Sequence, residues 1–324
     1  MPVHASSPAP QATGPLFVVF NLGSGAGDAE GARLAIEQAC ASAGRQLHLL
    51  GVDDPRRLAT IARDAVQRAQ AVQGVVVAAG GDGTLNAVAQ AVLGSGCAFG
   101  VLPQGTFNYF GRTHGIPQDT AMAMQLLLHA PVQPVQVGLV NDRVFLVNAS
   151  VGLYPRLLEE REGWKSRFGR SRLVAFGAGA ATLLRSYRSL RLQIEVQGQT
   201  RRVRTPTLFV GNNPLQLEQL GFPQAQDVAQ GALAAIALRP VSRWTMLWLM
   251  LRGAFGQLGQ ADQLLSIACT RLQAGLGWPQ TARHIKVATD GEVLRMRLPL
   301  VFRVAPEPLW LIRPPAPLPE QAAA

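Results

Sequence analysis

Short apolar runs alternate with helix-like stretches in the part of the chain that precedes Pro134. The predicted strands, which have the length and composition of buried strands, are Leu16–Phe20, Gln46–Leu50, Val75–Ala79 and Cys97–Pro103. The predicted helices between them are about Asp28–Ala43, Pro55–Ala71 and Thr84–Leu93. This alternation predicts a doubly wound α/β domain, with a parallel sheet and helices on both faces.

The pattern changes after Pro134, where strand-like segments are separated by turns instead of helices. These segments are Val137–Leu139, Arg143–Val151, Leu190–Val196, Arg202–Val210 and Gly231–Leu238. Later, Arg283–Arg297 has the pattern of two strands that meet at Asp290-Gly291-Glu292, an ordinary hairpin signal. We therefore predict a β-rich second domain that begins near residue 137, interrupted by a helical excursion at Pro155–Arg188.

Three predicted strands of the first domain end in loops of small or polar residues. Val75–Ala79 is followed by Gly80-Gly81-Asp82-Gly83 and then by a helix. Glycines leave the peptide N–H groups open to a ligand, and the helix N-terminus adds a favourable dipole for an anion. The junction is therefore a candidate phosphate site. On local evidence, an ordinary strand-to-helix turn explains it equally well.

The other two loops follow Leu16–Phe20 and Cys97–Pro103. The first contains Ser24, whose hydroxyl either binds phosphate or caps the next helix. Asp28 occupies a position that a dinucleotide fingerprint reserves for glycine, and no Gly-Lys-Ser/Thr follows, so neither standard phosphate motif is present. Ligands of parallel sheets bind at the carboxyl ends of the strands, where the three loops should converge.

Composition and net charge indicate the class of protein and the kinds of partner to expect. Its 324 residues suggest about two domains, and 48% hydrophobic with 15% charged residues indicates a globular protein. A net charge of +10 favours anionic partners, although an arginine-rich genome bias would produce the same excess. The charge has no supporting nucleic-acid-binding pattern, so no nucleic acid is expected. The three cysteines lack ligand spacing and indicate reduced thiols.

The ends and the apolar runs indicate a soluble cytoplasmic protein. The N-terminus lacks a basic region followed by an apolar one, and no apolar run reaches about 18 residues. Between Arg156 and Arg204, twelve basic residues face four acidic ones, which suits an anionic interface or a solvated helix face. Trp244–Leu258 is interpreted as a core or cap helix in preference to a lipid-binding one. Any membrane contact is therefore expected at the surface.

Four motifs in order resemble the diacylglycerol kinase catalytic family, which includes bacterial lipid kinases, sphingosine kinases and, more distantly, NAD kinase. The motifs are Asn21-x-x-Ser24-Gly25, Gly80-Gly81-Asp82-Gly83-Thr84, Pro103-x-Gly105-Thr106-x-Asn108 and Asp290-Gly291-Glu292. The resemblance covers about residues 15 to 313 and extends to Gly115-Ile116-Pro117 and Val210-Gly211-Asn212-Asn213.

The resemblance implies an α/β nucleotide-binding domain, a β-sandwich domain, and a site in the cleft between them. We expect the nucleotide-binding domain at residues 15–136 with a returning segment at 304–313, and the β-rich acceptor domain at 137–303. Residues 1–14 and 314–324 are expected to be disordered tails. ATP and Mg²⁺ are the implied donor and cofactor, and the implied reaction transfers the γ-phosphate to a lipid hydroxyl.

The resemblance also implies roles for single residues. Asp290 matches the proposed general base, with Glu292 beside it, whereas Asp82 is a rival base that fits magnesium binding or loop ordering better. Thr106 would contact the nucleotide. The other residues implied in nucleotide binding are Asn21, Ser24, Gly25, Gly80, Gly81, Asp82, Gly83, Thr84, Asn86, Gly105 and Asn108.

Two positions depart from the family pattern. Tyr109 stands where many members carry Asp, which weakens a metal or polar network there. Gln230 stands where bacterial members often have an Asp that helps to bind a structural magnesium ion. An amide supplies no anionic ligand, so that metal site is not expected, and the metal-binding residues stay unknown.

The sequence thus favours an ATP-dependent lipid kinase that acts on diacylglycerol or a related alcohol at an anionic inner membrane surface. A kinase for a sphingoid base, a polyprenol or a soluble acceptor stays open as an alternative. So does a nucleotide-binding or membrane-binding protein without catalysis, which Tyr109 and Gln230 keep open. The sequence leaves a homodimer open as well.

Overall fold

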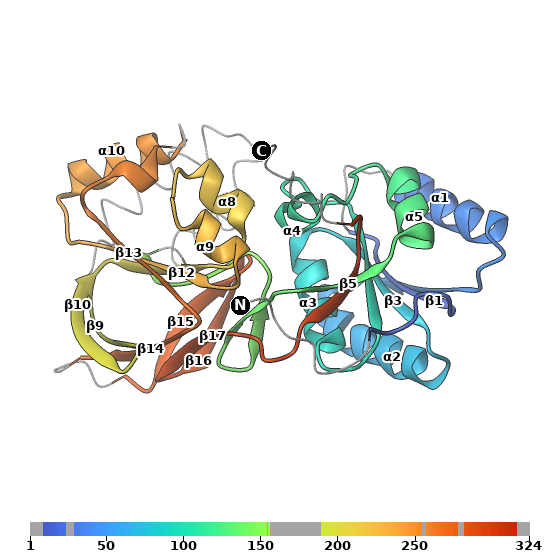
Figure 1. The fold of residues 1–324 in the computed structure, drawn as a ribbon, viewed down its shortest axis with the longest axis horizontal. Helices are drawn as coiled ribbons and strands as arrows, with labels where there is room; N and C mark the ends of the chain where they lie inside the picture. Colours follow the sequence, from blue (N-terminus) through green and yellow to red (C-terminus); the bar gives the residue numbers. More distant parts are fainter. Residues whose placement is uncertain are drawn as a thin grey trace, which may run out of the picture. The chain divides into compact units, whose positions relative to one another are not determined.

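The computed structural model describes residues 9–23, 29–153, 155, 189–254, 257–277 and 282–315. They divide into two compact units (Figure 1). The α/β unit contains the described residues up to Val135 and those from Glu307 onward, and the β unit contains those between Gln136 and Pro306. Ser24, Gly25 and all but Pro155 of the expected helical excursion lie outside the described residues.

The α/β unit is built on one six-stranded sheet. Its order is β2-β1-β3-β4-β18-β5, and β2, β1, β3 and β4 run parallel. The apolar runs produce these strands because both faces are covered, and every residue of β3 and β4 is buried. The bounds are β1 Leu16–Asn21, β2 Leu47–Val52, β3 Val75–Gly80, β4 Ala98–Pro103, β5 Val132–Val135 and β18 Leu309–Ile312.

Helices cover both faces of this sheet, as the alternation predicted. α1 packs against α5, and α2 packs against α3 (Figure 1). β18 comes from the far end of the chain and lies between β4 and β5, parallel to the first and antiparallel to the second. The helices are α1 Ala29–Ser42, α2 Leu58–Ala71 after the 3₁₀ turn Pro55–Arg57, α3 Asp82–Val92, α4 Tyr109–Thr113 and α5 Thr120–His129.

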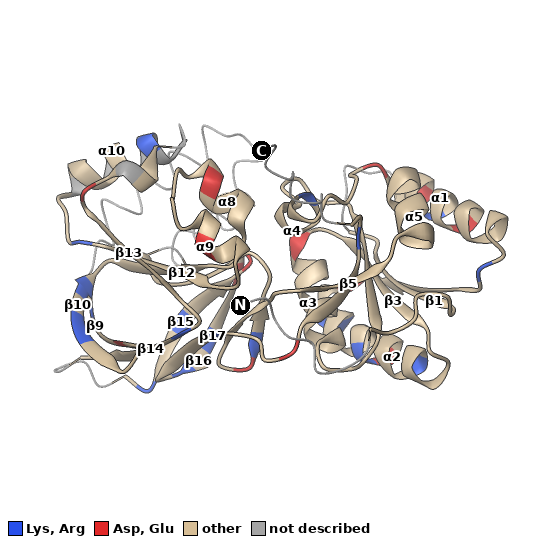
Figure 2. Cartoon of the chain, in the orientation of Figure 1, with Lys and Arg blue, Asp and Glu red and all other residues tan. Residues whose placement is uncertain are grey.

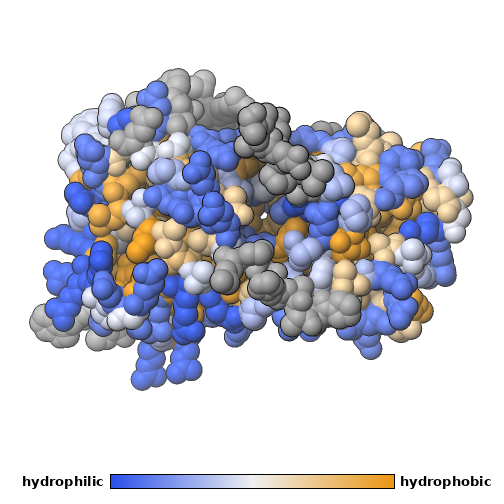
Figure 3. All heavy atoms as spheres, viewed as in Figure 1, coloured by the Kyte–Doolittle hydropathy of each residue, from blue (hydrophilic) through white to orange (hydrophobic). Residues whose placement is uncertain are grey.

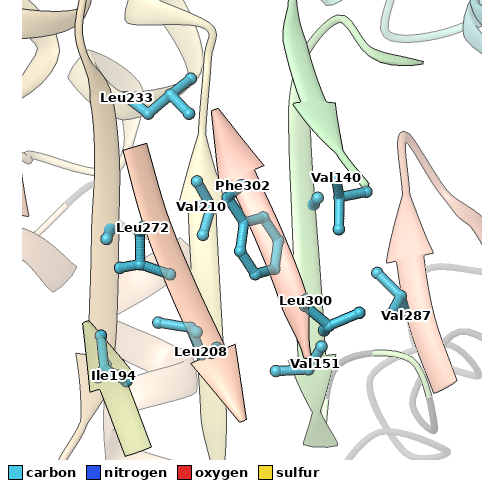
Figure 4. Packing of buried hydrophobic residues seen from close by; sticks show 14 of the residues in the cluster. Val140, Val151, Ile194, Leu208, Val210, Leu233, Leu272, Val287, Leu300 and Phe302 are labelled. Carbon is cyan, nitrogen blue, oxygen red and sulfur yellow. The ribbon is translucent and has the colours of Figure 1, made fainter. Parts of the chain in front are cut away.

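The β unit is a sandwich of two six-stranded sheets, of order β10-β9-β14-β17-β6-β7 and β13-β12-β11-β8-β15-β16. Its core lies between them, with Phe302 and Leu272 from one sheet facing Val210 and Val151 from the other (Figure 4). The strands are β6 Gly138–Val140, β7 Arg143–Phe145, β8 Asn148–Gly152, β9 Leu190–Val196, β10 Gln199–Thr205, β11 Thr207–Gly211, β12 Leu233–Leu238, β13 Leu264–Cys269, β14 Arg271–Leu276, β15 His284–Thr289, β16 Glu292–Arg297 and β17 Leu300–Val304.

Helices and a 3₁₀ turn with described bounds lie between β11 and β12 and between β12 and β13. They are α8 Pro214–Gln219, α9 Ala225–Ala229, α10 Arg243–Ala254 and the turn Leu258–Gln260. α8 and α9 bury Leu217 and Val228 in one small core, and α10 buries Met246 and Leu249 in another. None of the helices among the described residues is long and apolar enough to cross a bilayer.

Two predicted strands of the second domain were wrong, because each is two strands in different sheets. Arg143–Val151 divides into β7 and β8, since the N–H groups of Leu146 and Val147 donate to the Asp290 carboxylate and leave the strand ladder. Arg202–Val210 divides into β10 and β11 at Pro206, which has no N–H to donate.

One predicted helix boundary was also wrong. α3 begins at Asp82, two residues before the predicted Thr84, so part of the glycine loop is the first helical turn. Gly81 is the N-cap, with an extended backbone, and Asp82 in the first turn complements the positive end of the helix dipole. The peptide N–H groups of this loop therefore belong to a helix N-terminus.

Candidate functional site

The strand-to-helix junction at Gly80 is held by close contacts that only glycine permits. A Cβ atom on Gly80 would lie 2.6 Å from the Thr84 hydroxyl oxygen. That hydroxyl accepts a hydrogen bond of 2.8 Å from Asn21 Nδ2, and Asn21 Oδ1 accepts the N–H of Gly23 at 3.0 Å. The end of β1 is thereby joined to the first turn of α3.

The loop after β4 lies directly against this junction. A Cβ atom on Gly105 would lie 2.9 Å from Gly81 Cα and 2.7 Å from Asn108 Oδ1. Asn108, in a left-handed conformation, accepts the Gly105 N–H at 2.9 Å and donates Nδ2 to the Gly105 carbonyl at 2.7 Å. The N–H of Gln104 donates to the Gly80 carbonyl at 2.8 Å. Two glycine loops therefore form one continuous backbone surface.

Asp82 carries the negative charge at this surface. Its carboxylate accepts backbone hydrogen bonds from Asn108 and Tyr109, at the start of α4. Burial raises the pKa of the Asp82 carboxyl, and these two hydrogen bonds oppose the rise. Its Oδ1 atom is buried and has no hydrogen-bond partner among the described residues. A buried carboxylate oxygen of this kind is suited to a cation or to a donor on a bound ligand.

The neighbouring side chains differ in exposure. Thr106 and Phe107 are exposed, and the Phe107 ring stacks on Tyr109 with centroids 6.0 Å apart. The guanidinium of Arg112 lies 5.9 Å from the Tyr109 ring centroid. Gly83 is half-buried in the first turn of α3, and Asn86 is buried in the next. Thr106 is therefore accessible to a ligand, whereas Asn86 lies within the packed helix.

The second group of predicted residues lies in the β unit, at the β15–β16 hairpin. Asp290 has a positive φ of 47°, and its carboxylate accepts three backbone N–H groups. Leu146 donates to Oδ2 at 2.6 Å, while Val147 and Asn148 each donate to Oδ1 at 2.9 Å. Asp290 therefore shapes the connection between β7 and β8.

Glu292 lies beside this group on β16. Its carboxylate is 3.5 Å from Arg143 Nη2, and its side chain is largely exposed. The pair joins β16 to β7, the last strands of their respective sheets. An exposed ion pair of this kind contributes little to stability, about 0–1 kcal/mol.

A buried amide network surrounds the segment that Asp290 holds. Asn148 donates Nδ2 to Gln216 at 3.0 Å, and Asn212 donates Nδ2 to the Leu146 carbonyl at 3.1 Å. Gln136 donates to Asn212 Oδ1 at 2.8 Å. We missed Asn148, Gln136 and Gln216 in the sequence. Asn148 could have been identified in the sequence because it is an amide within the largely apolar segment Arg143–Val151.

The predicted site residues thus fall into two groups, one in each unit. The α/β unit brings together Asn21, Gly80, Gly81, Asp82, Thr84, Gly105 and Asn108. Asp290 and Glu292 belong to the β unit. The catalytic and nucleotide-binding roles of all these residues stay predictions.

The residues present fit a magnesium ion held mainly by phosphate. Among the described residues, no group of three or more His, Cys, Asp or Glu side chains could hold a metal ion. Magnesium commonly takes one or two carboxylates together with substrate phosphates and water. The buried Oδ1 of Asp82 matches such a carboxylate. Asp227 and Gln230, at α9, are both exposed.

His114 joins α4 to the returning strand β18. Its Nδ1 lies 2.9 Å from Arg313 Nη1, and its ring packs edge-on against Phe110, with centroids 4.7 Å apart. Burial, with a further contribution from the Arg313 charge, lowers the pKa of His114 from 6.5 to about 3. The imidazole is therefore neutral at neutral pH and accepts a hydrogen bond from the guanidinium.

This pKa predicts acid sensitivity. Below pH 6.5 His114 is protonated in the unfolded chain, whereas in the folded chain it stays neutral until about pH 3. The unfolded state therefore binds more protons in this range, and the free energy of unfolding falls as the pH drops. The loss from this group is at most about 1.4 kcal/mol per pH unit. Urea unfolding at several pH values gives the free energy of unfolding as a function of pH, and the slope of this free energy against pH should be shallower for His114→Gln than for wild type. His129→Gln, at an exposed histidine, is the control, and equal slopes for wild type and His114→Gln would contradict the prediction.

Comparison with known proteins extends over both units. The model of the diacylglycerol kinase catalytic domain matches residues 15–140. The model of the YegS C-terminal NAD kinase beta sandwich-like domain matches residues 161–313. A putative diacylglycerol kinase from Bacillus anthracis has a similar structure, with a TM-score of 0.69 and 21% identity, covering 94% of this chain and 98% of that one. That likeness supports the fold.

Shorter matches connect the chain to curated bacterial proteins. A probable lipid kinase YegS-like from Klebsiella pneumoniae is 44% identical over 79 residues, which are 24% of this chain and 27% of that protein. A protein of the same name from Pseudomonas putida is 43% identical over 79 residues, which are 24% of this chain and 26% of that protein. The alignments therefore span about a quarter of the length of these relatives.

Proposed function

We propose, from the premise that this chain belongs to the diacylglycerol kinase catalytic-domain family, that it is an ATP-dependent lipid kinase. The acceptor is the hydroxyl of diacylglycerol or a related lipid alcohol, and the donated group is the γ-phosphate. The α/β unit binds the nucleotide, and the β unit supplies groups for the acceptor.

The observation that carries the proposal is the backbone surface of Gly81 and Gly105 with the buried carboxylate of Asp82 beside it. Phosphoryl transfer depends on positioning and charge neutralisation more than on covalent chemistry. The N–H groups at the start of α3 supply donors and a positive dipole end for phosphate oxygens. The Thr84–Asn21 hydrogen bond keeps the first turn of α3 in position.

Asp82 is the residue that would hold a magnesium ion bound together with the nucleotide. Such an ion supplies neutralisation of the negative charge on the phosphates. The amides of Asn108 and Tyr109 hold the carboxylate so that Oδ1 is left for this role. Asp82 therefore serves better as a metal or phosphate organiser than as the base that activates the acceptor.

For the acceptor, we assign Asp290 as the group that accepts the hydroxyl proton, with Glu292 beside it. A carboxylate has about four lone-pair sites. The amides of Leu146, Val147 and Asn148 use three of them, and this orients the group firmly. These three amides restrict the directions from which an acceptor hydroxyl can approach the carboxylate.

The direct test is transfer from labelled ATP. Purified protein is incubated with Mg²⁺ and vesicles that contain diacylglycerol, and the expected product is labelled phosphatidic acid. A panel of sphingosine, a polyprenol and NAD tests the other acceptors. Transfer to NAD alone would replace the lipid assignment, and no transfer to any acceptor would overturn the kinase proposal.

A second candidate is a nucleotide-binding protein without transferase activity. The observation that favours it is the threefold amide contact of Asp290, because a carboxylate stabilised in this way is a weaker proton acceptor. Calorimetric titration with ATP and Mg²⁺ separates the two proposals. Binding without transfer across the acceptor panel would favour the second one.

The contact of the two glycine loops predicts the effect of an added methyl group. Gly105→Ala forces a Cβ atom to within 2.9 Å of Gly81 Cα, which must push the loops apart. We expect nucleotide affinity to fall by at least about tenfold, or 1.4 kcal/mol. Calorimetric titration measures it.

The control is Gly275→Ala on β14, where no atom lies within 4 Å of the added methyl group. Unchanged ATP affinity in Gly105→Ala would show that the phosphates do not bind at this backbone surface. A lower melting temperature for Gly105→Ala alone is expected as well, since the two loops are packed together.

A further inference from the structure

α10 is a two-sided helix at the outside of the β unit (Figure 1). On one side, Met246 and Leu249 are buried against Leu153, Leu238 and Ala261. On the other side, Trp244 is 74% exposed and Trp248 is 50% exposed. Positions four apart lie on the same face of a helix, so the two indoles form one surface. The core interpretation of this helix therefore accounts for only one of its sides.

The two tryptophans of α10 are among the few large apolar side chains that the described residues expose. Four of the nine exposed large hydrophobic residues among the described residues are Trp244, Trp248, Leu265 and Ile267. Leu265 and Ile267 lie on the edge strand β13 and pair with Ala237 and Ala235 of the sandwich core, so they belong to the other face of that sheet from α10. Figure 3 shows apolar surface among the hydrophilic side chains of this unit. Single exposed apolar side chains are ordinary, whereas two exposed indoles on one helix face indicate an interaction surface.

Positive charge accompanies the indoles. The guanidinium of Arg252 lies 4.7 Å from the Trp248 ring centroid, within the range of a cation–π interaction. Arg239, just before the helix, is exposed, and so is Asp262 after it. Figure 2 also shows basic residues on β10, an edge strand of the other sheet, where Arg201, Arg202 and Arg204 are exposed. The surface thus combines amphipathic rings with net positive charge.

We propose that the outer face of α10 is a bilayer-docking surface, which takes anionic phospholipid headgroups at Arg252 and the interfacial region at Trp244 and Trp248. Indole rings favour the membrane–water interface because one part is apolar and the N–H needs a polar partner. Arginine beside them attracts anionic lipid. Two exposed indoles with a guanidinium beside one of them match the interfacial region and the charged headgroups of an anionic bilayer. The inference rests on the proposed function, because a lipid kinase must reach an acceptor in a membrane.

The test is vesicle binding by the full chain. Flotation with vesicles of one part phosphatidylglycerol to three parts phosphatidylcholine should recover wild-type protein. The double variant Trp244→Ser/Trp248→Ser should bind at least tenfold more weakly. Met122→Ser, which removes a 62% exposed side chain from α5 in the α/β unit, is the matched control and should bind as wild type does. Circular dichroism melting checks that the double variant is folded.

Two further measurements make the test specific. Indole fluorescence should be quenched by brominated phospholipid in wild type, and the quenching should fall in the double variant. Arg252→Gln should weaken binding to phosphatidylglycerol vesicles several-fold and reduce its salt dependence. No vesicle binding by wild type, or equal binding by the folded double variant, would overturn the proposal. Self-association in sedimentation that is lost in the double variant would assign the face to a second copy of the chain instead.

The outcomes also separate this inference from the kinase proposal. Transfer to a monomeric short-chain diacylglycerol in solution needs no docking, so the double variant should phosphorylate it at the wild-type rate. Transfer to vesicle diacylglycerol should fall at least tenfold. Vesicle binding that depends on the tryptophans, without transfer to any acceptor, would support the docking surface and overturn the kinase. Equal loss of transfer to both substrates would overturn the docking role.

Discussion

Asp82→Asn is expected to lower phosphate transfer by about 10²–10³-fold, the usual loss when one oriented electrostatic group is removed from a transfer site. The carboxylate is held by the amides of Asn108 and Tyr109, and its buried Oδ1 has no hydrogen-bond partner among the described residues. Asparagine preserves the shape and removes the charge. Initial rates with saturating ATP, Mg²⁺ and diacylglycerol measure the effect.

The thermal stability of Asp82→Asn should not fall together with its transfer rate. Burial raises the pKa of Asp82, which means that folding disfavours its charged form. Removal of the charge should therefore leave the melting temperature at neutral pH equal or higher. Asp64→Asn, at an exposed carboxylate of α2 paired with Arg68, is the control for rate and stability. A large drop in melting temperature together with the rate would mean that Asp82 only holds the loops in place.

The same pKa shift predicts a pH dependence. Since the pKa is raised, Asp82 loses its proton at a higher pH than an ordinary aspartate, and transfer should rise as that proton leaves. The Asp82→Asn variant should lack this acid limb. Transfer rates of both proteins measured from pH 4 to pH 8 test this prediction. An acid limb that persists in Asp82→Asn would belong to another ionisable group.

Asp290→Asn is expected to abolish measurable transfer and to leave ATP affinity within about twofold of wild type. Asp290 belongs to the β unit, whereas the glycine loops belong to the α/β unit. Asparagine cannot take up the acceptor proton, so the chemical step is lost while the nucleotide surface is intact. Calorimetric titration with ATP and the transfer assay, run on one preparation, measure both quantities.

The hydrogen bonds of Asp290 make a stability measurement essential. If the asparagine Nδ2 replaces Oδ2, it faces the N–H of Leu146, and two donors then point at each other without an acceptor. This should lower the free energy of unfolding by about 1–3 kcal/mol. Glu195→Gln is the control, because Glu195 is an exposed carboxylate on β9 of the same unit and has no role in the proposed transfer. Equal losses of ATP affinity and transfer would assign Asp290 to the nucleotide site. Full transfer in a folded Asp290→Asn protein would exclude it as the base.

The first four strands of the α/β unit and the helices between them could be predicted from the sequence because their signals are local, whereas β13, β14 and β17 of the β unit were not predicted. Val75–Ala79 is uniformly apolar since both faces of β3 are covered, and this run needs no knowledge of its neighbours. The β10 and β11 strands were merged in the prediction because strand-forming residues stand on both sides of Pro206, and only the sheet that each strand joins distinguishes them.

The candidate site was predicted in its residue types but not in its contacts. The glycine motifs identified Gly81 and Gly105 separately, yet their contact depends on how β3 and β4 pair. The role of α10 was predicted only in part. The spacing of Met246 and Leu249 indicates a core face, while the exposure of Trp244 follows from which side the sandwich covers.

The sequence by itself determined the alternation of strands and helices up to β4, the β-rich character of the second domain, the glycine loops at the strand ends, and the carboxylates of Asp82 and Asp290. These follow from periodicity and from residue chemistry, which act within a few positions. Only the tertiary structure decided that Asp290 binds three amides near Leu146, 144 residues away in the chain. It also decided that Asp82 keeps one buried oxygen without a partner in the described part of the chain. Burial and hydrogen-bond direction depend on neighbours that chain folding brings together, and no local pattern records them.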